Sequence, residues 1–228
     1  MEIGKLYVVA TPIGNLGDIT FRAVETLKLV DFIICEDTRV TKILLDHYQI
    51  NKPLLVVNAH NELKSLEKIL TKLNSGESCA LVSDAGTPCI SDPGVRLINK
   101  VISENIEVVG IPGASAAILV LSISGLPTDS FVFEGFLPQK KGRQKKLKQL
   151  SEEERTIVLY ESTYRIKKLL EELNATMPDR LIVVARELTK KFEETWRGTA
   201  SQLLQNFEKR ITKGEFVVLI APLNWKEI

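Results

Sequence analysis

The chain has 228 residues, 30 Lys+Arg against 29 Asp+Glu, a formal net charge of +1 and 44% hydrophobic residues. These values exclude a disordered, collagen-like or disulfide-stapled chain, and the length suits one large domain or two small ones. Taken alone, a near-zero charge argues against a nucleic-acid partner, because nucleic-acid-binding domains are usually basic.

The chain carries no obvious membrane or metal signal. Every apolar run is shorter than the roughly 18–20 residues of a membrane span, and the N-terminal segment predicts a first strand, not a signal peptide. Cys35, Cys79 and Cys89 are scattered without a CxxC pair, which suits a reducing compartment and argues against a zinc site. We therefore expect a cytoplasmic protein, away from membranes, whose chemistry uses neither cysteine nor a bound metal.

Strand and helix patterns alternate through the first half of the chain. Thr20 is a candidate N-cap for the first helix. Strands are predicted at 6–10, 32–35, 54–57, 79–82 and 106–109, and helices at 21–30, 43–48, 63–73, 95–103 and 112–122. Such alternation predicts βαβ units and a parallel sheet.

A second α/β pattern follows a Gly- and Pro-containing connector at 124–127. Strands are predicted at 131–133, 156–160, 181–185 and 216–221, and helices at 144–150 and 166–173. Trp196 is expected to pack in the interior and not to stack on a base. The sequence therefore predicts an α/β fold of two domains, 1–124 and 125–228.

The charge is distributed unevenly between these two halves. Residues 1–124 hold 11 Lys+Arg and 14 Asp+Glu, a net of −3, whereas residues 125–228 hold 19 and 15, a net of +4. The excess concentrates in a run without acids: Lys140, Lys141, Arg143, Lys145, Lys146 and Lys148. This run is either a solvated helix face or a phosphate-binding patch.

Four unusual loops follow predicted strands, at 11–18, 36–39, 83–94 and 110–116. Ligands of open parallel sheets bind at the carboxyl ends of strands, so these loops predict a small-molecule cleft. The first loop is neither GxGxxG nor a Walker loop, so it gives no support for NAD or ATP. Plain alternatives remain open, because Asp37 or Thr38 is also a good helix cap and the glycines also suit tight turns. The lack of an obvious nucleophile favours a cofactor that carries its own reactive group.

Seven motifs resemble those of a known family. In chain order they are ATPIGNLGDIT, EDTR, HNE, SDAGTPCISDPG, PGASA, SGLPTDSFVFEGFLP and ARELTKKFEE. Over nearly the whole chain they resemble the ribosomal RNA small subunit cytidine 2′-O-methyltransferase family, part of the tetrapyrrole methylase superfamily of S-adenosylmethionine-dependent enzymes. The resemblance implies two α/β domains with S-adenosylmethionine in the cleft between them and a homodimer. It also implies methylation of a cytidine ribose in small-subunit (16S) ribosomal RNA, with no DNA partner.

The resemblance also implies site residues. The cofactor pocket would comprise Pro12, Gly14, Asn15, Asp84, Ala85, Gly86, Thr87, Pro112, Gly113, Ala114, Ser115, Ala116, Tyr160 and Glu161. Asp84 would contact the polar methionine moiety, and a bulky side chain at Gly113 should block the ligand. For an RNA substrate, the basic run found in the charge distribution would supply the contacts, from Lys140, Lys141, Arg143, Lys145 and Lys146.

The chain departs from the family pattern in three places. Many members have a histidine where this chain has Tyr164, which puts a histidine base in doubt, and Cys89 stands where the family more often has Gly. Many members also continue into a small helical extension, so we expect the RNA grip of this chain to come from the core or from a partner.

Methyl transfer to a ribose hydroxyl needs a proton acceptor and close positioning. The carboxylates available as a base are Glu36, Asp37, Glu161 and Glu187. We expect the segments around Asp37 and Glu187 to face the target nucleotide, with Arg39 and Arg186 holding phosphate or ribose. The alternative is that these four residues form an interdomain salt-bridge network.

Two other functions remain open at this point. One is methylation of a tetrapyrrole, another small molecule or a protein by the same superfamily chemistry; the basic run at 140–148 argues against an uncharged macrocycle. The other is a non-catalytic ribosome-assembly factor, against which the intact cofactor loops argue.

Overall fold

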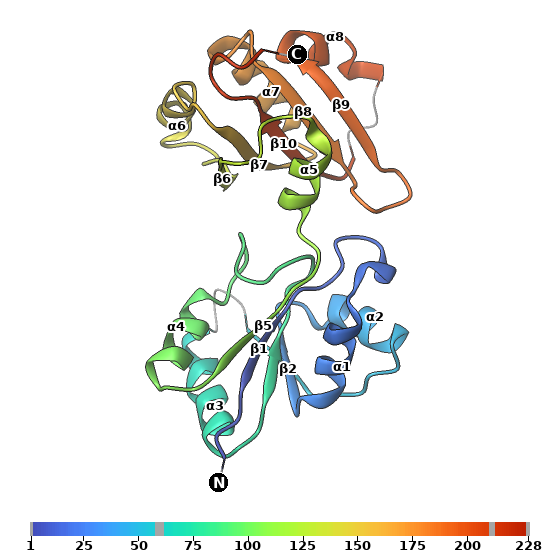
Figure 1. Ribbon diagram of the computed structural model, residues 1–228, viewed down its shortest axis with the longest axis vertical. Helices are drawn as coiled ribbons and strands as arrows, with labels where there is room; N and C mark the ends of the chain where they lie inside the picture. Colours follow the sequence, from blue (N-terminus) through green and yellow to red (C-terminus); the bar gives the residue numbers. More distant parts are fainter. Residues whose placement is uncertain (1, 58–61, 210–212, 227–228) are drawn as a thin grey trace. The chain divides into compact units, whose positions relative to one another are not determined.

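The computed structural model describes residues 2–57, 62–209 and 213–226 (Figure 1). The chain divides into two compact units, residues 1–115 and 116–228. This division lies before the expected boundary at 124, because helix α5 (Ala116–Ser124) packs against strand β10 (Glu215–Ile220) of the second unit. The apolar helix predicted at the end of the first domain therefore belongs to the second.

The first unit is built on a five-stranded sheet in the order β3-β2-β4-β1-β5. Its strands are β1 (Leu6–Val9), β2 (Phe32–Cys35), β3 (Leu54–Val56), β4 (Cys79–Leu81) and β5 (Val108–Ile111). All four pairings are parallel, as the alternation of strands and helices predicted. Both faces of such a sheet are covered, which is why every residue of β2 is apolar and buried.

Two helices cover each face of this sheet (Figure 1). On one side, α1 (Phe21–Leu29) and α2 (Thr38–His47) pack against residues that include Ile33; on the other, α3 (Glu62–Asn74) and α4 (Val95–Ser103) pack against Phe32 and Ile34. Successive residues of a strand point to opposite faces, so β2 contributes to both cores. Thr20 caps α1 as predicted, since its side chain accepts a hydrogen bond from the Ala23 N–H at 3.1 Å.

The second unit has a mixed sheet in the order β6-β7-β10-β8-β9. Besides α5 and β10 its elements are β6 (Phe131–Phe136), α6 (Arg143–Leu150), β7 (Thr156–Ser162), α7 (Ile166–Thr176), β8 (Leu181–Arg186), β9 (Glu194–Thr199), α8 (Ala200–Gln205) and the short helix η2 (Phe207–Lys209). Only β6 and β7 pair in parallel among these neighbours, and the other three pairings are antiparallel. Helices α6, α7 and α8 share one core with alternate residues of the central strands, and Trp196 is buried in it as predicted.

Within the described residues, none of the helices is long and apolar enough to cross a bilayer. The same part of the chain holds no group of three or more His, Cys, Asp or Glu side chains placed to bind a metal ion.

Candidate active site

Three loops of the first unit follow the neighbouring strands β4, β1 and β5 and are hydrogen-bonded to one another. The Thr11 N–H donates to the Gly86 carbonyl at 2.9 Å, and the Gly86 N–H donates to the Thr11 carbonyl at 3.1 Å. The Thr87 hydroxyl donates to the Ala114 carbonyl at 3.1 Å. These bonds bring the three cofactor segments predicted in this unit together at one edge of the sheet.

The predicted cofactor residues on this edge differ in what they offer a ligand. Asp84 and Ala85 are exposed, whereas Pro12 is buried. Asn15 accepts the Gly17 N–H at 3.0 Å and so caps the short helix η1 (Leu16–Asp18). The segment after β5 leads directly into α5, whose first N–H groups lack helical partners.

Two glycines on this edge have structural reasons of their own. Gly86 has φ of +84°, a left-handed conformation that favours glycine. A Cβ on Gly113 would lie 2.9 Å from the Ala10 Cβ, closer than van der Waals contact permits. Gly113 therefore lets the third loop approach the end of β1. The sequence predicts that a bulky side chain here blocks the ligand, and the structure adds that it would also clash with Ala10.

Four carboxylates form an acidic wall beside these loops: Glu36, Asp37, Asp84 and Asp92. Partial burial raises the pKa of Asp84 and of Glu36, and neighbouring acids raise both further. Burial, followed by the charges of Glu36 and Asp84, raises the pKa of Asp92 to about 6. The sequence reading missed Asp92; its place in the long loop after β4, between Ser91 and Pro93, was the available signal.

Asp37 differs electrostatically from its neighbours. Its side chain accepts hydrogen bonds from the Arg39 guanidinium, with Nε at 3.0 Å from Oδ1, and from the Arg39 N–H at 2.8 Å. These bonds lower the pKa of Asp37 to about 2. The helix-cap alternative is therefore confirmed, since Asp37 is the N-cap of α2. Arg39 remains largely exposed and available to an anion.

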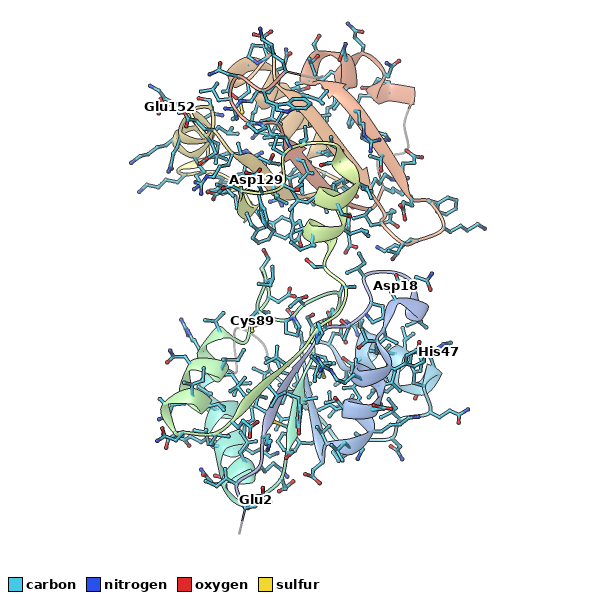
Figure 2. All side chains as sticks on the ribbon, viewed as in Figure 1. Glu2, Asp18, His47, Cys89, Asp129 and Glu152 are labelled. Carbon is cyan, nitrogen blue, oxygen red and sulfur yellow. The ribbon has the colours of Figure 1, made fainter. Side chains whose placement is uncertain are left out.

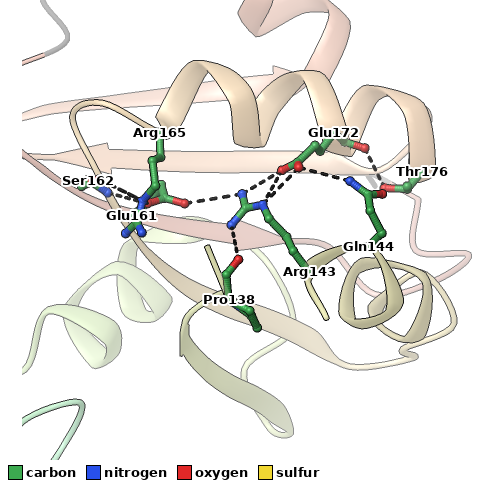
Figure 3. Close-up of polar contacts among 8 residues, drawn as sticks. All are labelled: Pro138, Arg143, Gln144, Glu161, Ser162, Arg165, Glu172 and Thr176. Carbon is green, nitrogen blue, oxygen red and sulfur yellow. Dashed lines mark hydrogen bonds and ion pairs between the residues drawn. The ribbon is translucent and has the colours of Figure 1, made fainter. Parts of the chain in front are cut away.

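In the second unit, Arg143 lies in a buried ion network and not on the surface (Figure 3). Its Nε donates to Glu172 Oε2 at 2.8 Å, its Nη1 donates to the Pro138 carbonyl at 3.3 Å, and its Nη2 is 3.7 Å from Glu161. The side chain is only 4% exposed. The prediction that Arg143 contacts RNA is therefore wrong, because its charge is used to join α6 to α7.

Tyr160 and Glu161 lie at the end of β7. The Glu161 carboxylate is 1% exposed and accepts hydrogen bonds from Arg165 Nε at 2.7 Å and from the Ser162 N–H at 2.8 Å. The Tyr160 ring meets Phe133 and Phe136 edge to face, with centroids 5.1 and 5.7 Å apart. The predicted cofactor role of Glu161 would thus have to use its backbone, since its side chain already binds Arg165.

Arg186 is buried, and its guanidinium binds carbonyl groups of its own unit. It donates to Lys213 O at 2.7 Å and to Phe192 O at 2.9 Å. This arginine holds the 187–193 loop in place and has no exposed face for a phosphate, which corrects the expectation that it grips the nucleotide.

Glu187 follows with φ of +50° and accepts hydrogen bonds from Lys190 Nζ at 3.0 Å and from the Glu215 N–H at 3.1 Å. Burial alone would raise the pKa of Glu187, but these bonds lower it overall. The ion pairs that the four predicted catalytic residues form, Asp37–Arg39, Arg186–Glu194 and Glu187–Lys190, each join residues of the same unit.

The remaining basic residues of the predicted patch differ from Arg143. Lys140, Lys141 and Lys145 are exposed in the turn before α6 and on its first turn. Lys146 is half-buried and pairs with Glu134 at 2.7 Å. Of the HNE motif, His60 and Asn61 lie outside the described residues.

Comparison with known proteins decides the family. The family model of tetrapyrrole (corrin/porphyrin) methylases matches residues 5–204. A ribosomal RNA small subunit methyltransferase I from Synechocystis is 52% identical over 96% of this chain and 79% of its own length. Proteins of the same name from Thermotoga maritima and Escherichia coli O157:H7 are 46% and 48% identical, over 99% and 77% of their lengths.

The chain belongs to the ribosomal RNA small subunit methyltransferase I family. The family model and solved structures agree that this chain has the tetrapyrrole methylase fold. A cobalt precorrin-4 methyltransferase matches 95% of the chain with a TM-score of 0.72 at 18% identity. A uroporphyrin-III C-methyltransferase from Thermus thermophilus, solved with S-adenosyl homocysteine, matches 95% with a TM-score of 0.65 at 15% identity. The fold class and the family suggested by the seven motifs are confirmed.

Proposed function

We propose that this chain transfers a methyl group from S-adenosylmethionine to the ribose 2′-hydroxyl of a cytidine in small-subunit ribosomal RNA. The observation that carries the proposal is 46–52% identity over nearly the whole chain to relatives named as small-subunit rRNA methyltransferases. Methyltransferase chemistry with this cofactor is common to the family. The 2′-oxygen and the cytidine come from the family resemblance of the motifs and are the parts to be tested.

The residues on the sheet edge fit the cofactor. The hydrogen bonds between the loops after β1, β4 and β5 fix backbone groups around Gly86 and Ala114, which suits a ligand held mainly by the main chain. The exposed Asp84 supplies negative charge, which suits the cationic sulfonium and ammonium groups of the cofactor. When bound, S-adenosylmethionine supplies an electrophilic methyl carbon. The closing role expected of the second unit stays a prediction.

The ribose hydroxyl must lose its proton, and this chain offers several carboxylates as acceptors. A good general base has a pKa near the working pH. The low pKa of Asp37 and the lowered pKa of Glu187 make these two poor acceptors, whereas Glu36 is exposed and its pKa is raised. We therefore assign proton acceptance to Glu36. Asp37 then holds Arg39, whose exposed guanidinium suits a phosphate of the RNA.

The exposed lysines of the second unit supply the RNA contacts in this proposal. Lys140, Lys141 and Lys145 carry charges that phosphates can neutralise. The homodimer remains a prediction of the family resemblance, and the cytoplasmic location remains a prediction from the cysteine pattern and composition. Free rRNA and rRNA within the assembled small subunit are alternative substrates, between which the sequence does not choose.

The deciding experiment maps ribose methylation in the small-subunit rRNA of cells that lack this gene. Loss of one cytidine ribose methyl, restored by the wild-type gene and not by a Glu36→Gln copy, is the expected result. An unchanged map would overturn the proposal. Transfer of labelled methyl in vitro to free rRNA or to small subunits then identifies the substrate particle.

A further inference from the structure

A groove of about 410 Å³ lies in the second unit between β6 and α6, where it is lined along the helix by residues from Gly142 to Gln149. Residues along it include Glu134, Phe136, Leu137, Pro138, Lys145 and Lys146. Its volume falls within the range of about 300–1,000 Å³ that is typical of small-molecule sites. The groove combines the aromatic ring of Phe136, the aliphatic side chains of Leu137 and Pro138, and the lysines Lys145 and Lys146.

Phe136 presents its ring to the surface because of a local irregularity in β6. The pairing of β6 with β7 shifts register between Phe133 and Gly135, and Gly135 has φ of +59°. Such a bulge redirects the side chains that follow it. Phe136 is 53% exposed, an unusual position for a large aromatic residue at the end of a strand.

The Phe136 ring is also held in orientation from one side. The Tyr160 ring meets it edge to face at 5.7 Å, and the Arg165 guanidinium carbon lies 5.9 Å from its centroid. A ring supported in this way offers a platform without first having to be ordered, which reduces the entropy lost on binding.

The charges around the groove favour an anion. Lys146 and Glu134 neutralise each other at 2.7 Å. Within the described part of the chain, Lys140, Lys141 and Lys145 have no carboxylate partner. Glu152, Glu153 and Glu154 follow the other end of α6, whereas Lys140 and Lys141 precede its first turn (Figure 2 labels Glu152).

We propose that this groove binds one unstacked nucleotide of single-stranded RNA, with the base stacked on Phe136 and the adjoining phosphates at Lys145 and Lys140. Recognition of single-stranded RNA combines these two elements, an aromatic platform and a cationic track. The proposal rests on the rRNA methylation proposed above and names a contact with its substrate. It adds an aromatic residue to what had been a purely electrostatic patch.

The test separates stacking from charge by using two probes of equal charge. Fluorescence anisotropy measures binding of oligocytidylate and of an oligomer with the same phosphates but abasic riboses. Phe136→Leu keeps an apolar side chain without a flat ring, and Phe136→Trp restores a ring. Lys145→Ala removes one cation. Phe21→Leu, at an exposed phenylalanine on α1, and Lys168→Ala, at an exposed lysine on α7, are the matched controls.

Phe136→Leu should weaken oligocytidylate binding roughly tenfold and leave the abasic oligomer unaffected, while Phe136→Trp binds like the wild type. Lys145→Ala should weaken both probes and reduce the slope of log affinity against log salt by about 0.7. Thermal unfolding of each variant verifies the fold. If Phe136→Leu binds both probes as the wild type does, the proposal is overturned.

Methyl transfer to small subunits by the wild-type protein is measured in parallel. If the wild type methylates the subunit and Phe136→Leu binds RNA normally, the nucleotide-binding role of the groove is overturned and the proposed function stands. A wild type that does not methylate rRNA, but whose oligocytidylate binding depends on Phe136, supports the groove and overturns the proposed function.

Discussion

The backbone N–H of Asp37 donates a hydrogen bond to Asp84 Oδ1 at 3.2 Å, which joins the loop after β2 to the loop after β4. The side chain of Asp37 at the same time holds Arg39. One residue therefore caps α2, positions an exposed guanidinium and fixes the carboxylate expected to contact the cofactor. Nearby, the charges of Glu36 and Asp84 help to raise the pKa of Asp92, so these three acids are electrostatically coupled, whereas Asp37 is held ionised by Arg39.

Removing the charge of Asp92 should stabilise the protein at neutral pH. The folded protein holds the Asp92 proton more tightly than the unfolded chain, because its pKa is raised to about 6. The contribution of Asp92 to stability therefore falls as pH rises from about 4 to about 6. Asp92→Asn should raise the free energy of unfolding at pH 8 by about 1 kcal/mol, after allowing for solvent screening, and by much less at pH 4. Urea unfolding at both pH values measures this, with the exposed Asp129→Asn as control. An equal gain at both pH values would contradict the linkage.

Gly113→Ala should destabilise the first unit through a clash with Ala10. The added Cβ would lie 2.9 Å from the Ala10 Cβ, and overpacking of this kind costs about 1–3 kcal/mol. In the double variant Ala10→Gly with Gly113→Ala, the clash is removed, so the loss should be smaller than the sum of the two single changes. Denaturant unfolding measures the cycle, and calorimetric titration with S-adenosylmethionine accompanies it. Additive losses of stability would show that the clash is not the reason for this glycine.

Arg143→Met should lower the free energy of unfolding, because Arg143 is part of a buried ion network. The change leaves Glu172 and Glu161 buried with fewer cationic partners, and breaking a buried ion pair from one side costs about 3–5 kcal/mol. Lys145→Met, two residues along the same helix, should stay within about 0.5 kcal/mol of the wild type. Chemical unfolding of both variants checks the contrast. If Arg143→Met were as stable as the wild type and bound RNA more weakly, Arg143 would be an RNA contact and not a structural residue.

Glu36→Gln should slow methyl transfer more than Asp37→Asn or Glu187→Gln. General-base catalysis contributes about 100- to 10,000-fold, so Glu36→Gln should lower the single-turnover rate by at least about 100-fold while cofactor binding persists. The wild-type rate should rise with pH through the raised pKa of Glu36, and the Glu36→Gln rate should lose this dependence. Rapid-quench measurements on the rRNA substrate test both. Near-normal turnover by Glu36→Gln would show that another group accepts the proton of the ribose hydroxyl.

Local patterns predicted most elements, because strand length and helix period depend on neighbouring residues. The buried strand Phe32–Cys35 and the helix Val95–Ser103 have the predicted bounds, and Thr20 caps the helix where expected. The place of α5 was not predictable in this way. Its apolar sequence is compatible with either unit, and only its packing against β10, about a hundred residues later, decides the question.

In the site, too, local sequence patterns predicted the positions of the loops but not the contacts made between distant residues. Motifs located the loops, yet Arg143 and Arg186 look like surface cations in the sequence and are buried in the structure. Their partners, Glu172 and the carbonyls of Phe192 and Lys213, come from other elements or from a folded loop, which no local pattern reports. Asp92 was overlooked because its raised pKa arises from burial in the fold and from two acids, Glu36 on the loop after β2 and Asp84 earlier in the same loop.

The strand order of the second unit has a consequence for synthesis on the ribosome. Residues up to Ile111 complete the first sheet, so that unit has all its strands once about half of the chain has emerged. In the second unit, the central strand β10 comes last in the chain and separates β7 from β8. Until Glu215–Ile220 has been translated, β6–β7 and β8–β9 remain two separate ribbons with unpaired edges. Domains generally fold as units from the N-terminus during translation, so unpaired strand edges persist for longer in the second unit than in the first.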